Sequence, residues 1–313
     1  MSLLLDKIAR RVDGICLYGI APPKAATTPE RLAEIAAMQT ARIRALAPDG
    51  LIVYDLQDES ERNRAPRPFP FLPTIDPDEY AGRWLANLDL PKIIYRSIGR
   101  FSPESLGNWA AATTPSPRFT VLVGASTSRG AERPGFRLDD AYAVLQARAR
   151  DIVLGGIAIA ERHEAKGDEH VRLLAKVERG CRFFVTQAVY DVTSTKSLLS
   201  DYYHSLRARA EKPVPIILTF SPCGSPKTLA LLRWLGVSVP RWLENELVHH
   251  GDSLTRSVDL CDEICDDLIA FARAKGIPIG INVESVSIAR AEIEASVELF
   301  TRLRRRWPPV HGE

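Results

Sequence analysis

Short segments rich in β-branched residues alternate with longer segments of helical periodicity along the whole chain, and this alternation restricts the fold more than any other feature. Eight segments are typical of buried strands: GICLYGI from Gly14, GLIVYD from Gly50, KIIYRSI from Lys92, FTVLVGA from Phe119, DIVLGGIAIA from Asp151, CRFFVTQAVYD from Cys181, VPIILTF from Val214 and IPIGINVES from Ile277. Eight strand–helix repeats predict a (β/α)8 barrel, a TIM barrel. An open doubly wound α/β sheet is the alternative, because the sequence does not show closure.

The helices between these strands have recognisable starts. Thr28, Ser102 and Ser225 each precede a proline and a helical pattern, which is typical of a capping side chain followed by the first helical turn. Gly236 ends the helix that begins after Ser225, in the place where glycine commonly stops a helix.

The length of 313 residues fits one barrel, so residues 1–313 are expected to form a single domain with two additions. A polar, proline-rich loop at 57–73 follows the second predicted strand, and a helical insertion at 240–275 precedes the eighth. Because the loops that follow the strands form the active face of such barrels, loop 57–73 is expected to wall or cover the site.

The composition narrows the classes of partner. The 41 basic and 39 acidic residues leave a formal charge of +2, which gives no case for nucleic acid or an anionic membrane. No apolar run approaches the roughly 20 residues that span a bilayer, so a cytoplasmic protein is expected. The five cysteines are scattered without a CxxC pair, so neither a disulfide framework nor a metal site is expected. Self-association into a homo-oligomer is left open.

The barrel topology alone nominates residues for the site, because functional side chains lie at the carboxyl ends of the strands. The nominated residues are rich in groups that bind a polar heterocycle or transfer a proton, and they are Tyr18, Asp55, Ser97, Ala125, Glu161, His163, Gln187, Tyr190, Ser221 and Glu284. Arg96 and Arg100, near the end of the third strand, are further candidates for holding an anionic group.

The segment from Ala160 to Asp191 resembles the central segment of the methylenetetrahydrofolate reductases. It carries AERH after the fifth predicted strand, KVERG at the end of the next helix and VTQAVYD in the sixth strand. Weaker similarities are the Pro22-Pro23 pair, ERNR from Glu61, VSVPRWL from Val237 and RAE from Arg290. The resemblance implies an oxidoreductase that reduces 5,10-methylenetetrahydrofolate to 5-methyltetrahydrofolate, a step of one-carbon metabolism and methionine biosynthesis.

That reaction has definite chemical requirements. Protonation at N10 opens the five-membered ring of the folate and leaves an iminium that accepts a hydride. The site therefore needs an acid near N10, anchors for the pterin and a hydride donor stacked on the iminium.

Four positions depart from the flavin-dependent members of that family. The resemblance implies an acid at the position of Gly19, a second acid at Ala125, a histidine at Tyr95 and an aromatic residue at Ile159. These departures count against bound FAD and favour NAD(P)H acting directly on the folate, as in the flavin-free reductases of this kind.

Other positions retain the family pattern. By resemblance, His163 and Lys176 contact the cofactor, and Gln187 binds the folate. From their places on or beside the strands, Tyr95 and Thr186 complete the expected cofactor contacts, and Tyr18 and Tyr190 complete the expected folate contacts.

Three acids are candidates for the proton donor: Glu161 first, because strand end and motif agree on it, then Glu284 and then Asp55. Each is alternatively an ion-pair partner, for example of Arg162. Two other functions remain open: a folate-dependent one-carbon or methyl transferase on the same barrel, and a non-catalytic folate-binding homologue. Removal of Glu161 or Glu284 separates these classes, because an enzyme loses rate and a binding protein does not.

Overall fold

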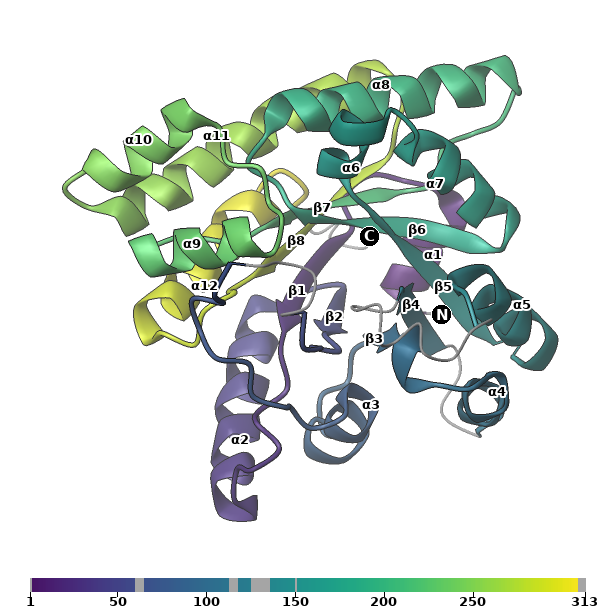
Figure 1. Cartoon of the computed structure of the whole chain (residues 1–313), viewed down its shortest axis with the longest axis horizontal. Helices are drawn as coiled ribbons and strands as arrows, with labels where there is room; N and C mark the ends of the chain where they lie inside the picture. Colours follow the sequence, from purple (N-terminus) through teal and green to yellow (C-terminus); the bar gives the residue numbers. More distant parts are fainter. Residues whose placement is uncertain (1, 60–64, 113–117, 125–135, 150, 309–313) are drawn as a thin grey trace.

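The computed structural model describes residues 2–59, 65–112, 118–124, 136–149 and 151–308, and it confirms the closed barrel (Figure 1). Eight parallel strands pair in chain order, and β8 pairs with β1 from Cys16↔Ile281 to Gly19↔Glu284. This last pairing excludes the open sheet. The strands are β1 (Cys16–Ile20), β2 (Gly50–Val53), β3 (Lys92–Ser97), β4 (Arg118–Val123), β5 (Ile152–Ala158), β6 (Cys181–Ala188), β7 (Ile216–Phe220) and β8 (Ile279–Glu284).

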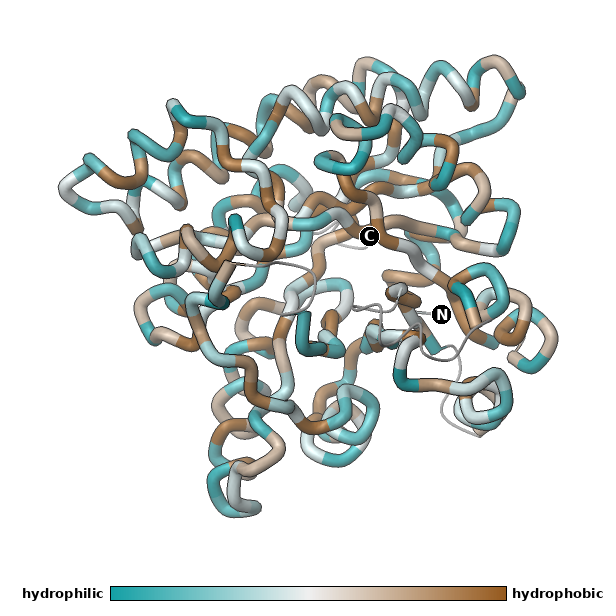
Figure 2. Tube along the Cα trace, viewed as in Figure 1, coloured by the Kyte–Doolittle hydropathy of each residue, from teal (hydrophilic) through white to brown (hydrophobic). Residues whose placement is uncertain are grey.

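Helices surround the barrel, and their hydrophobic residues alternate with hydrophilic ones along the chain, as expected for helices with one buried face (Figure 2). The helices are α1 (Leu3–Arg10), α2 (Pro29–Leu46), α3 (Pro77–Glu79), α4 (Pro103–Ala111), α5 (Leu138–Arg148), α6 (Ala160–Lys166), α7 (Glu169–Glu178), α8 (Val192–Ala208), α9 (Pro226–Trp234), α10 (Arg241–His249), α11 (Ser253–Ala274) and α12 (Arg290–Arg304), with a π-helical turn at Tyr80–Trp84 and a 3-10 turn at Ile98–Arg100. None of the helices within the described ranges is long and apolar enough to cross a membrane.

The predicted helix caps are confirmed. The side chains of Thr28, Ser102 and Ser225 each accept a hydrogen bond from a backbone N–H in the first turn of α2, α4 and α9, respectively. Gly236 follows α9 with φ +90°, a left-handed conformation that glycine adopts without a steric penalty.

Two apolar layers hold the barrel together. The interior is filled by inward-facing side chains from the strands and α1, among them Leu17, Ile52, Tyr95, Val121 and Phe183. A larger layer lies between the strands and the surrounding helices. Cys261 and Cys265 belong to this outer layer, and all five cysteines of the chain are buried and unpaired. Because side chains alternate along each strand, one residue decides whether a group faces the interior or the helices.

The two additions expected from the sequence, loop 57–73 and segment 240–275, are found near α9, the first by contact and the second along the chain. The loop after β2 contacts α9, because Trp234 Nε1 donates to Ala65 O at 2.8 Å. The segment 240–275 contains α10 and α11, and α11 packs against α8 and α12 in the outer ring. α11 therefore has the place of the seventh barrel helix, and α9 and α10 are the extra helices between β7 and α11.

Candidate functional site

A cluster of polar side chains closes the interior at the carboxyl end of the barrel. Glu284 ends β8, and its strand neighbour in β1 is Gly19. A Cβ atom on Gly19 would lie 2.8 Å from Cε2 of Tyr54 and 3.2 Å from Oδ1 of Asn282. The space beside Gly19 is therefore filled by Tyr54, and the carboxyl group nearest to this position along the sheet belongs to Glu284.

A chain of hydrogen bonds fixes the direction in which Tyr54 donates. Thr219 Oγ1 donates to Thr186 O and so accepts from Asn282 Nδ2 at 3.3 Å. The same amide donates to the Tyr54 hydroxyl at 2.9 Å. The hydroxyl therefore accepts from Asn282 and gives its own proton to the hydrogen bond with the Glu284 carboxylate.

The pKa of Glu284 lies near neutral pH. Burial raises the pKa of its carboxyl group to about 7, and the hydrogen bond from Tyr54 lowers it less than burial raises it. Burial together with Glu284 also raises the pKa of the Tyr54 hydroxyl well above its usual value, so the phenol stays protonated. The Glu284 residue as a whole keeps some exposure at the end of β8. An acid of this kind can donate a proton at physiological pH.

The same cluster offers a hydrogen-bond acceptor. Asn282 is fully buried, yet its Oδ1 has no partner among the described residues. Buried amide oxygens are nearly always hydrogen-bonded, so this atom is available to an N–H group of a ligand or to a water.

Tyr95 forms one wall of the cluster. Its ring packs edge-to-face on Tyr54 with the centroids 4.9 Å apart. Burial and the nearby Glu284 carboxylate raise the pKa of its hydroxyl above the ordinary value. Of the expected cofactor contacts, Tyr95 is the one that the structure places beside a candidate acid.

Glu161 and Gln187 lie at the rim, where β5 and β6 meet the connection between α9 and α10. Glu161 Oε1 accepts from Ser238 N at 3.1 Å, and burial, with a smaller effect of Asp191, raises the pKa of this carboxyl group. Gln187 Nε2 donates to Leu235 O at 2.8 Å. Both side chains are partly exposed and accessible to a ligand.

Asp55, the third candidate for the proton donor, is an ion-pair partner in the structure, which is the alternative that the sequence left open. Its side chain is 1% exposed and accepts from Ser97 N at 2.8 Å, from Gln57 Nε2 at 2.7 Å and from Arg100 Nη1 at 2.9 Å. All its oxygens are thus occupied by protein donors, one of them a guanidinium. Asp55 ties the ends of β2 and β3 together and does not share the cluster of Glu284.

Three further side chains that were expected to contact a ligand face away from the interior at the carboxyl end of the barrel. Tyr18 packs on the outside of β1, where its hydroxyl bonds Ser296 at 2.7 Å. Tyr190 is 1% exposed and donates to Ser221 O at 2.5 Å. Thr186 Oγ1 accepts from Thr219 N at 2.9 Å within the sheet. Strand alternation and local hydrogen bonding remove all three from direct ligand contact.

His163 and Lys176 also lie outside the barrel interior. His163 Nε2 bonds Asp201 Oδ2 on α8 at 3.1 Å, and its ring meets that of His170 on α7. Lys176 Nζ donates to Ile157 O at 2.5 Å behind β5. These positions give no support to the flavin contacts that the resemblance implies. Ala125, the position of the second flavin-adjacent acid, lies outside the described residues.

An unpaired guanidinium lies where loop 57–73 contacts α9. Arg67 stacks between Phe71 and Trp234, with its guanidinium carbon 5.4 Å and 5.0 Å from the two ring centroids. Its Nε and Nη1 are buried and have no hydrogen-bond partner among the residues that the structure describes. Arg96 and Arg100, the arginines expected to hold an anion, differ from Arg67 in having carboxylate partners: Arg96 pairs with Asp76 at 2.6 Å and Arg100 pairs with Asp55, although Arg96 Nε is also without a partner among the described residues.

A cavity of about 600 Å³ opens at the opposite, amino end of the barrel. It lies between α1 and the starts of β5 and β6, and its charged lining is Arg11 and Arg182. It contains no acid able to donate a proton. The carboxyl end, which holds the titratable cluster, is the better candidate for the site.

Sequence reasoning did not select Tyr54, Asn282 or Arg67. Tyr54 directly precedes Asp55, and the alternation that begins with inward-facing Ile52 would have selected Tyr54. Asn282 lies two residues before Glu284 on the same face of β8 and would follow from the same rule. The sequence carried no signal for Arg67, because its aromatic neighbour Trp234 comes from a distant segment.

A close relative of this chain is found among the solved structures. An uncharacterized protein from Clostridium thermocellum that binds two copies of 5-methyl-5,6,7,8-tetrahydrofolic acid is 43% identical, with a TM-score of 0.86, over 97% of this chain and 100% of its own. A family 10 endoxylanase from a sugarcane soil metagenome is 9% identical, with a TM-score of 0.50, over 96% of this chain and 99% of its own. Xylanase 10C of Cellvibrio japonicus is 8% identical, with a TM-score of 0.50, over 94% of this chain and 66% of its own.

The two xylanases show the barrel fold alone, since their identity is low. No protein-family model matches the chain, and no curated protein does. The resemblance to the methylenetetrahydrofolate reductases therefore stays a prediction.

Proposed function

Because the chain belongs to the same family as the Clostridium thermocellum protein, which binds 5-methyltetrahydrofolic acid, we propose that it binds a reduced folate at the carboxyl end of its barrel. The unpaired Oδ1 of Asn282 suits an N–H group of the pterin, and the partly exposed Gln187 supplies a second amide at the rim. The Tyr54 and Tyr95 rings give the pterin an aromatic wall.

The proposed reaction is the reduction of 5,10-methylenetetrahydrofolate by NAD(P)H. Glu284 donates its proton to N10, the bond between N10 and the methylene carbon breaks, and the ring opens to an iminium at N5. A hydride from the reduced nicotinamide then forms the new C–H bond, which gives 5-methyltetrahydrofolate and NAD(P)⁺. The observation that carries this proposal is the carboxyl group of Glu284, whose pKa is raised to about 7 beside Gly19.

The residues fit a flavin poorly. The two family contacts that the sequence retains, His163 and Lys176, are engaged with Asp201 and with the backbone of β5. Tyr54 fills the space beside Gly19, and Tyr95 stands where the family has a histidine. The proposal therefore takes NAD(P)H as a second substrate that delivers its hydride directly, and it routes no step through FAD.

Arg67 is proposed to hold a carboxylate of the folate's glutamate. Its guanidinium is fixed between two aromatic rings and has buried nitrogens without partners, an environment that favours an anionic group. Tetrahydropteroate, which lacks the glutamate, tests this role. Its affinity is expected to be weaker than that of tetrahydrofolate in the wild-type protein and equal to it in Arg67→Leu; an equal loss in both proteins would contradict the role.

The decisive experiment follows NADH and NADPH oxidation by purified protein, with and without 5,10-methylenetetrahydrofolate and with and without added FAD. Folate-dependent oxidation that needs no FAD, with 5-methyltetrahydrofolate as product, is the expected result. A yellow preparation with the visible absorbance of flavin would contradict the direct transfer.

A non-catalytic folate-binding protein is the second candidate, favoured by the Clostridium thermocellum relative, whose bound compound is the product of the proposed reaction. It predicts 5-methyltetrahydrofolate binding without nicotinamide oxidation under any condition. A methyl transferase predicts loss of the methyl group from 5-methyltetrahydrofolate when an acceptor thiol is present. Mass analysis of the folate after incubation distinguishes all three.

A further inference from the structure

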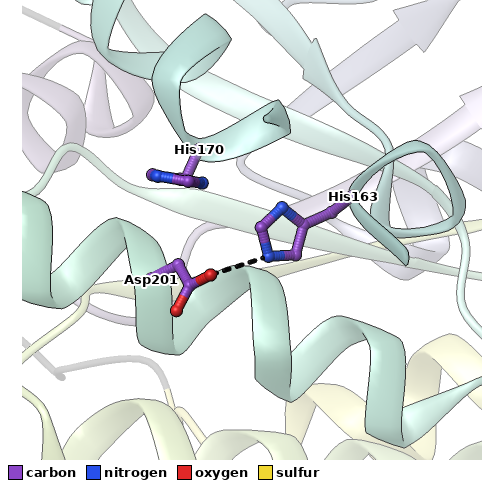
Figure 3. Close-up of side chains that lie close together, drawn as sticks. All are labelled: His163, His170 and Asp201. Atoms are coloured by element: carbon purple, nitrogen blue, oxygen red, sulfur yellow. Dashed lines mark hydrogen bonds and ion pairs between the residues drawn. The ribbon is translucent and has the colours of Figure 1, made fainter. Parts of the chain in front are cut away.

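A second polar cluster lies outside the barrel, at the junction of three helices. His163 comes from α6, His170 from α7 and Asp201 from α8, and their side chains converge (Figure 3). His163 Nε2 and Asp201 Oδ2 are 3.1 Å apart, and the two imidazole rings meet at nearly a right angle with centroids 5.3 Å apart. One potential ligand atom from each side chain lies within 4.8 Å of the other two.

The two histidines have buried nitrogens that the protein leaves unsatisfied. His163 is 5% exposed, and its Nδ1 has no hydrogen-bond partner among the residues that the structure describes. The Nδ1 of His170 is buried and unpartnered in the same way. Leaving a buried polar atom unpaired costs about 1–3 kcal/mol. The unpartnered Nδ1 of His170 is available to a metal ion, and on His163 the nitrogen that lies beside Asp201 is Nε2 (Figure 3).

We infer that His163, His170 and Asp201 bind one divalent transition-metal ion of the zinc class. Two imidazoles and a carboxylate form the mixed nitrogen and oxygen ligand set that suits Zn²⁺, and a water completes four-coordination. This assignment adds a site that the cysteine pattern does not predict, and it does not rest on the proposed reaction.

The three ligand atoms need to move only a short distance toward one another to bind one ion. Ligand bonds of about 2.0–2.2 Å in a tetrahedron place the ligand atoms roughly 3.4 Å apart, and the three atoms here lie within 4.8 Å of one another, so the approach needed is at most about 1.4 Å. Asp201 is 53% exposed, so its side chain has room to rotate, and it leaves a route for the ion from solvent. His163 is held by the packing of α6 and is the fixed member of the set.

The location implies a structural role for the ion. The helices α6, α7 and α8 pack against one another, and each contributes one ligand. α6 begins directly after β5, and Glu161 at the rim of the mouth is two residues before His163. A bound ion therefore joins three outer helices and holds the segment that presents Glu161, without contact with the folate.

The test uses full-length protein treated with a chelator and then freed of it. Zn²⁺ is titrated in competition with a chromogenic chelator, and Co²⁺ binding is followed by its visible spectrum. The expected result is one equivalent of Zn²⁺ per chain, a Co²⁺ spectrum typical of four-coordination, and a higher Tm with metal. Because His163 is buried and its replacement risks misfolding, the variants are His170→Ala and Asp201→Asn, each expected to weaken Zn²⁺ binding at least about tenfold.

The matched control is His204→Ala, one turn beyond Asp201 on α8, where the ring makes an edge contact with Tyr203 and is not a member of the cluster. This variant is expected to keep wild-type Zn²⁺ affinity, and circular dichroism confirms that each variant is folded. Absence of a stoichiometric site in the wild type would overturn the assignment. Equal affinity of wild type, His170→Ala and His204→Ala would overturn it as well.

Discussion

Glu284 and Asp55 are both carboxylates at the carboxyl end of the barrel, and their surroundings are opposite. Asp55 accepts from a backbone amide, a glutamine and the Arg100 guanidinium. Glu284 receives a hydrogen bond from the neutral phenol of Tyr54, and burial raises its pKa to about 7. The oxygens of Asp55 are engaged by a cation and two other donors, whereas burial among neutral partners lets Glu284 act as a proton donor. The difference separates a structural acid from a candidate catalytic one.

The largest expected effect is the loss of turnover in Glu284→Gln. The amide keeps the size of the side chain but has no proton to give to N10, and general acid catalysis contributes roughly 10²–10⁴-fold to rate. We expect kcat for folate-dependent NAD(P)H oxidation to fall by that amount, while the affinity for 5-methyltetrahydrofolate, measured by calorimetry, stays close to wild type. Unchanged kcat in this variant would return Glu161 to first place, to be tested by Glu161→Gln.

Asp55→Asn is expected to act on stability and not on chemistry. In this variant the NH2 group replaces one of the two carboxylate oxygens. In one orientation it faces the N–H donor of Ser97, and in the other it faces the donors of Gln57 and Arg100. Loss of the ion pair and this mismatch are expected to lower the free energy of unfolding by about 2–3 kcal/mol. Urea denaturation measures the loss. A fall in kcat of more than a few-fold in the folded fraction would contradict the distinction drawn between the two acids.

The sequence predicted the eight strands and the acid at the end of β8, because both depend on local pattern. It did not predict what surrounds that acid. Glu284 lies beside Gly19 only because β8 pairs with β1 at closure, a contact between the two ends of the chain. The alternation of side chains along β2 would have selected Tyr54, and not Asp55, as the residue that faces the interior. The expected roles of His163 and Lys176 depended on how α6 and α7 pack on the barrel, which spacing along the chain does not encode.

The raised pKa of Glu284 makes the stability of the protein depend on pH. The pKa of Glu284 is raised from 4.5 unfolded to about 7 folded, so its folded state binds the extra proton between these values, and stability falls as pH rises from about 4.5 to 7. Glu284→Gln removes this penalty. We expect the variant to exceed wild type at pH 8 by about 2 kcal/mol, with allowance for partial exposure, and to match it at pH 4. A variant less stable than wild type at pH 8 would refute the raised pKa.

The smallest effect on kcat is expected from Tyr54→Phe. This variant is informative because it should also shift the pH–rate profile in a defined direction. The hydrogen bond from the Tyr54 hydroxyl lowers the pKa of Glu284, so its removal raises that pKa further. The basic limb of the pH–rate profile, which reports loss of the proton from Glu284, should therefore move to higher pH. At acidic pH, loss of the hydrogen bond that positions Glu284, worth about 1 kcal/mol, should lower kcat roughly fivefold.

A purely structural role for Tyr54 would lower kcat equally at every pH and leave the basic limb of the pH–rate profile in place. Only a change in the shape of the profile shows that Tyr54 acts through the proton on Glu284, whereas Asp55→Asn, which lies outside this hydrogen-bond chain, should leave the shape unchanged.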